Sequence, residues 1–188
     1  MPAVGKKEIN YPSALVIAEQ LQDRIEPLCS KFSFAGSLRR KQAYVGDIEI
    51  VCLPRFATEV PAGEMFPKPD VNLVVNHLQN NRSTNSRGYY ITKGGDRYHQ
   101  LMYAGVQVDL FMPLPGQWGR ILALRTGPDS YSIKLASRWK QMGYKGHNGE
   151  LIRLRRDKDG NRVKPEFPTE KSFFAFLGRD YVEPENRG

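Results

Sequence analysis

The sequence predicts an α+β protein in which a mixed sheet with helices is followed by a smaller unit of helices and a hairpin. Two stretches, residues 45–53 and 106–112, alternate between apolar and polar side chains as strands do. Beyond a proline-rich stretch at residues 113–116 the apolar spacing becomes helical. We therefore expect one domain over residues 1–113 and a second over residues 114–188.

The elements around the first strand follow from local signals. A helix is expected from Pro12, because apolar residues recur at helical spacing and proline suits a first helical turn. Residues 32–34 form a short strand that runs into Gly36. Residues 54–69 contain four prolines and are predicted to be a loop. Asp70 is then expected to cap a second helix.

Turn signals organise the rest of the chain. Lys-Gly-Gly-Asp at residues 93–96 predicts a hairpin that leads into the strand over residues 106–112. Two helical stripes follow the proline-rich stretch. Asp-Lys-Asp-Gly at residues 157–160 predicts a second hairpin, and Thr169 is expected to cap a short final helix.

Two carboxylates stand two residues apart in the strand over residues 45–53. Asp47 and Glu49 should share one face of this strand, while Ile48 and Ile50 point to the core. Neighbouring carboxylates repel each other unless a cation lies between them, and oxygen ligands favour Mg²⁺ or Mn²⁺. The alternative is the solvated face of an antiparallel sheet, which is the commoner origin of an Asp-x-Glu pattern.

A small polar turn precedes these carboxylates. Gly36 and Ser37 offer free backbone N–H groups and a hydroxyl to an anion, and the basic residues Arg39, Arg40 and Lys41 follow. Carboxylates on one wall and these donors on the other fit a nucleoside triphosphate, with Ser37 and Arg40 on its outer phosphates. A plain turn with solvated charges is the alternative.

A third carboxylate, Asp109, lies in the strand over residues 106–112, on the same face as Gln107 and Phe111. Its alternative role is that of an ordinary acid in an edge strand.

The motifs Gly-Ser-x-Arg-Arg, Gly-Asp-Ile-Glu-Ile and Val-Asp-Leu-Phe resemble the signature of the nucleotidyltransferase palm in DNA polymerase family X, the DNA polymerase beta family. The resemblance covers about residues 13–185, including Thr-Gly-x-Asp at residues 126–129 and the segment over residues 169–184. It implies a palm followed by a thumb. Because only about 35 residues precede Gly36, we expect a reduced form without the family's N-terminal lyase domain and fingers.

The resemblance implies metal-dependent addition of nucleotides to a DNA 3′ end, of the gap-filling or repair type. It implies that Asp47, Glu49 and Asp109 are catalytic and hold two Mg²⁺ or Mn²⁺ ions. The residues expected to bind the nucleoside triphosphate are Gly36, Ser37, Arg40, Gly46, Thr126, Gly127 and Asp129. The thumb residues expected to hold a DNA primer–template or gapped DNA by its backbone are Lys134, Arg138, Lys140, Lys145, Arg153, Arg155 and Arg156.

Several positions depart from the family pattern. Glu49 stands where Asp is usual, and Gln107 where Arg is common. Leu124 and Arg125 stand where the family usually has an aromatic pair that excludes a ribose 2′-OH. Ser132 and Ala136 stand where the family usually has an Asn and an Arg near the base pair. These departures bear on sugar selection and template fidelity rather than on phosphoryl chemistry. The resemblance also implies a cis peptide bond between Gly127 and Pro128.

Other functions stay open. One is a template-independent terminal nucleotidyltransferase or a small-molecule nucleotidyltransferase, although small acceptors would not need the polymerase-like C-terminal part. Another is a non-catalytic DNA-binding module. A decayed site should lose its carboxylates first, and all three are present here.

Composition is consistent with a nucleic-acid partner. The net charge of +8 favours a polyanion. Cys29 and Cys52 lie in apolar contexts and are expected to be reduced core residues. Because the chain has neither a membrane-spanning apolar run nor the apolar centre of a signal peptide, we expect no membrane partner. A monomer is expected, although no pattern in the sequence determines the oligomeric state. Its expected location is the cytoplasm, or a host cytoplasm if the protein is viral.

Overall fold

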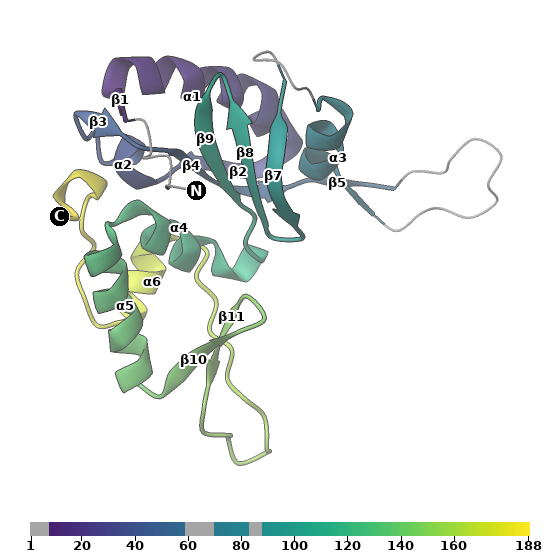
Figure 1. The fold of residues 1–188 in the computed structure, drawn as a ribbon. Coiled ribbons are helices and arrows are strands. Elements are labelled where there is room, and N and C mark those ends of the chain that lie inside the picture. Colours follow the sequence, from purple (N-terminus) through teal and green to yellow (C-terminus); the bar gives the residue numbers. More distant parts are fainter. Residues whose placement is uncertain (1–7, 59–69, 83–87) are drawn as a thin grey trace, which may run out of the picture.

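The computed structural model describes residues 8–58, 70–82 and 88–188, and its centre is a five-stranded mixed sheet (Figure 1). The strands, in their order across the sheet, are β2 Cys29–Phe34, β4 Ile48–Pro54, β9 Val106–Phe111, β8 Tyr98–Tyr103 and β7 Tyr90–Gly95. Strands β4 and β9 are parallel, and the other neighbouring pairs are antiparallel. The expected mixed sheet with helices is therefore confirmed.

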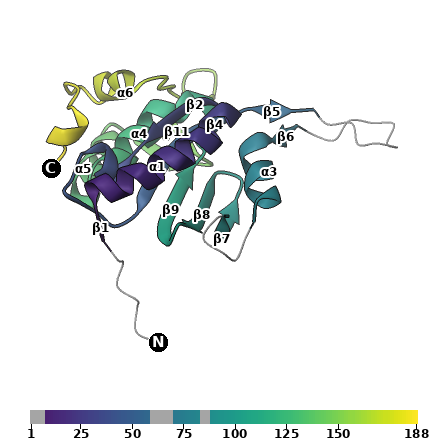
Figure 2. The same ribbon diagram turned by 90° about the horizontal axis from the view of Figure 1, so that it is seen from above.

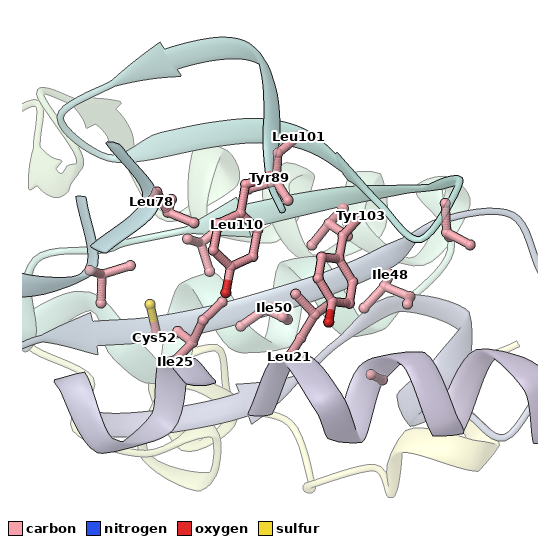
Figure 3. Packing of buried hydrophobic residues seen from close by; sticks show 14 of the residues in the cluster. Leu21, Ile25, Ile48, Ile50, Cys52, Leu78, Tyr89, Leu101, Tyr103 and Leu110 are labelled. Carbon is pink, nitrogen blue, oxygen red and sulfur yellow. The ribbon is translucent and has the colours of Figure 1, made fainter. Parts of the chain in front are cut away.

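One face of the sheet packs against helices α1 (Tyr11–Ile25) and α3 (Leu73–Asn80), as Figure 2 shows from above. Helix α1 begins where Asn10 caps it, and Pro12 lies in its first turn as expected. In Figure 3, Leu21 of this helix lies against Ile50 of the sheet. Both cysteines are buried in this core as free thiols, and the alternation expected for β4 and β9 is confirmed.

The other face of the sheet packs against the C-terminal part of the chain. Helix α4 (Trp118–Thr126) brings Trp118 and Leu122 into a cluster with Val51 of β4 and Phe111 of β9. The short helix α2 (Gly36–Arg39) also contacts this side, between β2 and β4. Because this cluster joins residues before and after 113, the two parts of the chain share buried surface, and the boundary between them stays a prediction.

The C-terminal part forms its own core. Its elements are η2 Pro115–Gln117, α4, α5 Asp129–Gln141, β10 Tyr144–His147, β11 Glu150–Arg153, α6 Glu170–Phe176 and η3 Pro184–Asn186. Leu135, Trp139 and Phe173 are buried together between α5 and α6. Thr169 caps α6 as predicted and forms a reciprocal capping box with Ser172.

Two predicted element boundaries are wrong. The predicted strand over residues 45–53 is divided, because β3 (Tyr44–Val45) pairs with β1 (Ile9–Asn10) while β4 pairs with β2 and β9. Helix α3 is capped by Asn72, which accepts hydrogen bonds from two helical N–H groups, and not by Asp70. Asp70 instead accepts a hydrogen bond from Thr58.

The second hairpin turns earlier than predicted. Strands β10 and β11 are joined through Asn148 and Gly149, which both have positive φ, as type I′ hairpin turns require. Residues 157–160 form only a local turn, in which the Asp157 carboxylate accepts two backbone N–H groups. In the first hairpin, Gly95 pairs with Tyr98, so the chain reverses at Asp96 and Arg97, two residues later than the predicted turn at Gly94-Gly95.

Part of the predicted loop at residues 54–69 forms a short ladder between β5 (Phe56–Ala57) and β6 (Val71–Asn72). Residues 59–69 lie outside the described part of the structure. Among the helices that are described, none combines the length and apolar character needed to cross a membrane.

Candidate active site

Glu49 and Asp109 are register partners on the parallel strands β4 and β9. They lie on the face of the sheet that packs against α4. Asp47 lies in the bend before β4, not in the strand itself. Burial and then the charge of Asp47 raise the pKa of Glu49 to about 7. Arg125 lowers this pKa, Asp109 raises it by less than Arg125 lowers it, and Arg40 lowers it least. The structure thus brings the three predicted carboxylates within electrostatic range of one another.

The three carboxylates do not lie close enough together in this structure to ligate one metal ion jointly. In the described ranges, no group of three or more His, Cys, Asp or Glu side chains is close enough to hold a metal ion. The donor chemistry nevertheless fits a hard divalent cation, since all the donors are carboxylate oxygens. Burial, and then the charge of Asp47, raise the pKa of Glu49 to about 7, and a bound cation would offset both effects. The sites expected for Mg²⁺ or Mn²⁺ therefore stay a prediction.

Gly36 allows the Glu49 side chain its position. It has φ of +58°, and a Cβ at this residue would lie 2.1 Å from Oε2 of Glu49. Only glycine adopts this conformation readily and leaves room for the carboxylate. The sequence indicated an anion site here, and the anion that approaches Gly36 in this structure is the side chain of Glu49.

Three neutral side chains donate hydrogen bonds to Asp109. Tyr98 and Gln100 reach it from β8, with donor–acceptor distances of 2.9 and 3.2 Å, and Gln107 reaches it from its own strand. Burial and the contact with Asp109 raise the pKa of Tyr98 to about 12, so its hydroxyl stays a donor. The sequence analysis missed Tyr98 and Gln100, although alternation in the neighbouring strand would place them on this face.

A cavity of about 410 Å³ opens beside Asp109, between the sheet and the C-terminal part. Arg125 of α4 lines it, with its guanidinium carbon 4.0 Å from the ring centroid of Phe111. A larger cavity of about 930 Å³ is lined by Val75 and His99 and by none of the three carboxylates. The smaller cavity is therefore the candidate substrate cleft.

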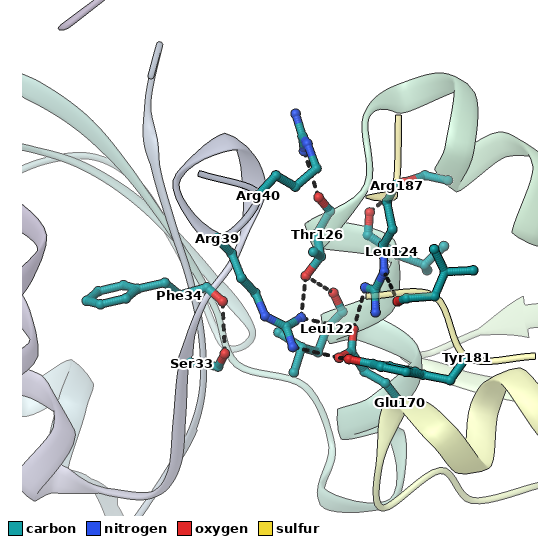
Figure 4. Close-up of polar contacts among 12 residues, drawn as sticks. Ser33, Phe34, Arg39, Arg40, Leu122, Leu124, Thr126, Glu170, Tyr181 and Arg187 are labelled. Carbon is teal, nitrogen blue, oxygen red and sulfur yellow. Dashed lines mark hydrogen bonds and ion pairs between the residues drawn. The ribbon is translucent and has the colours of Figure 1, made fainter. Parts of the chain in front are cut away.

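The basic turn after Gly36 joins the two parts of the chain, as Figure 4 shows. Arg40 donates to the backbone carbonyl of Thr126 over 2.6 Å, and Arg39 donates to the Thr126 hydroxyl over 2.6 Å. Thr126 is fully buried, and its hydroxyl donates to the carbonyl of Leu122. The Thr126 hydroxyl, which was expected beside the nucleotide, thus uses its hydrogen bonds on Arg39 and on the Leu122 carbonyl.

Two comparisons with known proteins agree with this geometry. The family model for the DNA polymerase beta thumb matches residues 121–188. The chain is also 25% identical over 187 residues to Repair DNA polymerase X of African swine fever virus (isolate Tick/Malawi/Lil 20-1/1983), a match that covers 97% of this chain and 96% of that protein. The chain is thus similar to DNA polymerase family X along nearly its whole length. In the terms of that family, the sheet with the carboxylates is the palm and the C-terminal part is the thumb.

In the C-terminal part, which matches the thumb model, Glu170 lies at the centre of a buried ionic network (Figure 4). Its carboxylate accepts from Arg39 of the palm at 3.0 and 2.7 Å, and from Arg187 near the C-terminus at 2.6 Å. Burial alone would raise the pKa of Glu170, but the hydrogen bonds from both arginines outweigh it and hold the pKa below the ordinary value. The sequence analysis did not identify this network.

The turn between α4 and α5 departs from one family expectation. No cis peptide bond occurs in the described chain, so the expected cis bond between Gly127 and Pro128 is wrong. A Cβ on Gly127 would lie 2.5 Å from the ring of Tyr131, which therefore packs closely on the turn. Asp129 is exposed at the start of α5. Tyr131 thus supplies an aromatic ring at this turn, although neither Leu124 nor Arg125 does.

The other predicted residues lie on the surface or near it. Ser37 in α2 and Gly46 before β4 are half-buried. Arg138 donates to the carbonyl of Leu177, which gives it a structural role inside the thumb. The remaining predicted DNA-binding residues are exposed, and they are Lys134, Lys140, Lys145, Arg153, Arg155 and Arg156.

Proposed function

We propose that this chain is a member of DNA polymerase family X, a metal-dependent DNA polymerase that adds nucleotides to a DNA 3′ end during gap filling or repair. The observation that carries the proposal is the in-register pair of Glu49 and Asp109, with Asp47 close enough to raise the pKa of Glu49. Asp109 of this pair lines a cleft between palm and thumb. The viral relative, named a repair DNA polymerase, supports the same reaction class.

Each part of the site has a chemical task. When bound, divalent cations would make the primer 3′-OH more acidic and neutralise charge on the triphosphate. Asp47, Glu49 and Asp109 would hold these cations through carboxylate oxygens. Ser37 and the backbone N–H of Gly46, together with the Arg40 guanidinium, would bind the outer phosphates of a nucleoside triphosphate.

The exposed basic side chains of the thumb would hold DNA through its phosphates. Lys134 and Lys140 project from α5, and Lys145 and Arg153 from the hairpin. Phosphate contacts of this kind position DNA without reading its sequence, and they weaken as salt is added.

A template-independent terminal transferase is the second candidate function. The hydroxyl of Ser132, which stands where the family usually has asparagine, donates to the carbonyl of Leu124 over 2.5 Å. Because this hydroxyl already donates a hydrogen bond within the thumb, it is not free to donate one to the nascent base pair.

Primer extension with Mg²⁺, with and without a template strand, separates these functions. A repair polymerase extends only the templated primer, whereas a terminal transferase extends both. Tight DNA binding without any extension, in Mg²⁺ or in Mn²⁺, would show a non-catalytic binding module and sink the proposal.

A further inference from the structure

The two oxygens of the Asp109 carboxylate have unequal surroundings. Oδ1 accepts hydrogen bonds from Tyr98 Oη at 2.9 Å, from Gln100 Nε2 at 3.2 Å and from Gln107 Nε2 at 3.3 Å. Among the residues that the structure describes, Oδ2 accepts only from Gln107 Nε2, at 3.2 Å. One oxygen is therefore held in place, and the other keeps most of its capacity to accept or to ligate.

The donors are themselves fixed by the sheet. Gln100 is the register partner of Asp109 on β8, and its side-chain oxygen lies 3.1 Å from the hydroxyl of Thr92 on β7. Tyr98 is the register partner of Phe111, and their ring centroids lie 5.2 Å apart. The Asp109 carboxylate thus ends a chain of contacts across three neighbouring strands.

All three donors are uncharged. Within the described residues, no Lys, Arg or His forms an ion pair with Asp109. A cationic partner would offset the negative charge of the carboxylate and compete with a metal ion for it. Neutral donors fix its orientation and leave that charge in place.

We propose that Tyr98, Gln100 and Gln107 are positioning residues, which hold Oδ1 of Asp109 and present Oδ2 to a divalent cation. This inference rests on the proposed function, because it assigns a task to residues around the proposed metal carboxylate. It identifies Tyr98 as the main donor, since its hydrogen bond is the shortest of the set.

The test is Mn²⁺ binding to the purified protein without DNA or nucleotide, with the free ion measured by electron paramagnetic resonance. Tyr98→Phe removes one hydroxyl and keeps the ring on Phe111, and Gln107→Leu removes the donor on the strand of Asp109 itself. Loss of such supporting hydrogen bonds costs roughly 10–100-fold in metal affinity, so we expect at least about a tenfold rise in the Mn²⁺ Kd. Tyr103→Phe is the matched control, because Tyr103 is buried in β8 on the opposite face of the sheet.

A raised Kd in Tyr98→Phe and Gln107→Leu, with Tyr103→Phe unchanged, supports the assignment. Wild-type affinity in both folded variants overturns it. The proposed function fails separately: a wild-type protein that binds Mn²⁺ but never extends a primer refutes polymerase activity, while the variant affinities still decide the positioning role. In an active protein, excess Mn²⁺ should restore most of the rate of Tyr98→Phe, which a general folding defect would not allow.

Discussion

The Glu170 carboxylate in the thumb accepts hydrogen bonds from both terminal guanidinium nitrogens of Arg39 in the palm, at 3.0 and 2.7 Å. Arg39 directly precedes Arg40, the residue expected to bind the outer phosphates of the nucleotide. The same carboxylate neutralises Arg187, which is fully buried. The ion pair with Glu170 therefore couples the nucleotide-binding turn to the thumb, in addition to the hydrogen bonds that this turn donates to Thr126.

Replacing Glu170 with alanine should destabilise the protein strongly. The change leaves Arg187 buried without its ionic partner, and breaking a buried pair in this way costs about 3–5 kcal/mol. Urea unfolding measures the loss. Glu185→Ala is the control, because its ion pair with Lys41 is solvent-exposed and should change the free energy of unfolding very little. Equal stability of the two variants would refute the central role of Glu170.

The same network predicts how acid affects stability. Because the pKa of Glu170 in the folded state lies below the ordinary value of 4.5, its contribution is complete above that pH and is lost as the pH falls below it. The free energy of unfolding, followed downward from pH 5, should decline in the wild type. In Arg39→Met the decline should be shallower, since one of the two cations that lower the pKa is gone.

Glu49 predicts the opposite slope at higher pH. Its folded-state pKa of about 7 exceeds the ordinary 4.5, so the folded protein holds a proton that the unfolded chain releases between these values. Without metal, the free energy of unfolding should therefore fall as the pH rises from 4.5 to 7, and Glu49→Gln should remove this slope. Mn²⁺ should bind more tightly over the same rise in pH, since binding must displace that proton. A metal affinity independent of pH in this window would contradict the assignment.

Gly36→Ala tests the close approach of backbone and carboxylate. The new Cβ would collide with Oε2 of Glu49, and the positive φ adds its own penalty. Gly105→Ala is a matched control, because Gly105 has φ of +79° and nothing within 4 Å of an added Cβ. We expect the control to lose about 1–2 kcal/mol of stability and keep its activity. Gly36→Ala should lose more stability and most of its nucleotide addition, and normal activity there would show that Glu49 can move freely.

Much of the palm could be predicted because its strands alternate cleanly. Because Ile48 and Ile50 are buried on one face of the sheet, Glu49 between them must lie on the opposite face. Asp109 lies on that face for the same reason, since its neighbours in β9 are buried in the same core. The position of Asp47 could not be predicted, since the break before β4 depends on pairing with the distant residues of β1. Local alternation does not reveal which partner strand each segment chooses.

The polar networks around the site were the least predictable part. Arg39 and Glu170 are far apart in sequence, and nothing in either local pattern indicates that they meet. The helix caps show the same limit on a smaller scale: both Asp70 and Asn72 suit a cap, and the pairing of β6 decides in favour of Asn72. Tertiary contacts that satisfy buried charges are determined by the fold as a whole.

Sugar selection offers a further prediction. Leu124 packs in the thumb core and Arg125 lies over Phe111, so neither supplies the aromatic ring usual in the family. We expect kcat/KM for ribonucleotides to come within about a hundredfold of that for deoxyribonucleotides, a difference of roughly 2.7 kcal/mol. Paired measurements on one primer–template give the ratio. Discrimination well above a thousandfold would point to another gate, and Tyr131→Ala would then test the ring that packs on Gly127.

The most direct test of the account is single-nucleotide addition by Asp109→Asn at a Mg²⁺ concentration matched to the wild type. The substitution keeps the size of the side chain and removes the charge that a divalent cation requires, while the sheet should stay folded. The account predicts that the wild type extends a templated primer and that the variant, folded to the same extent by circular dichroism, does not. A variant rate within tenfold of the wild type would contradict the assignment of Asp109 to the metal site.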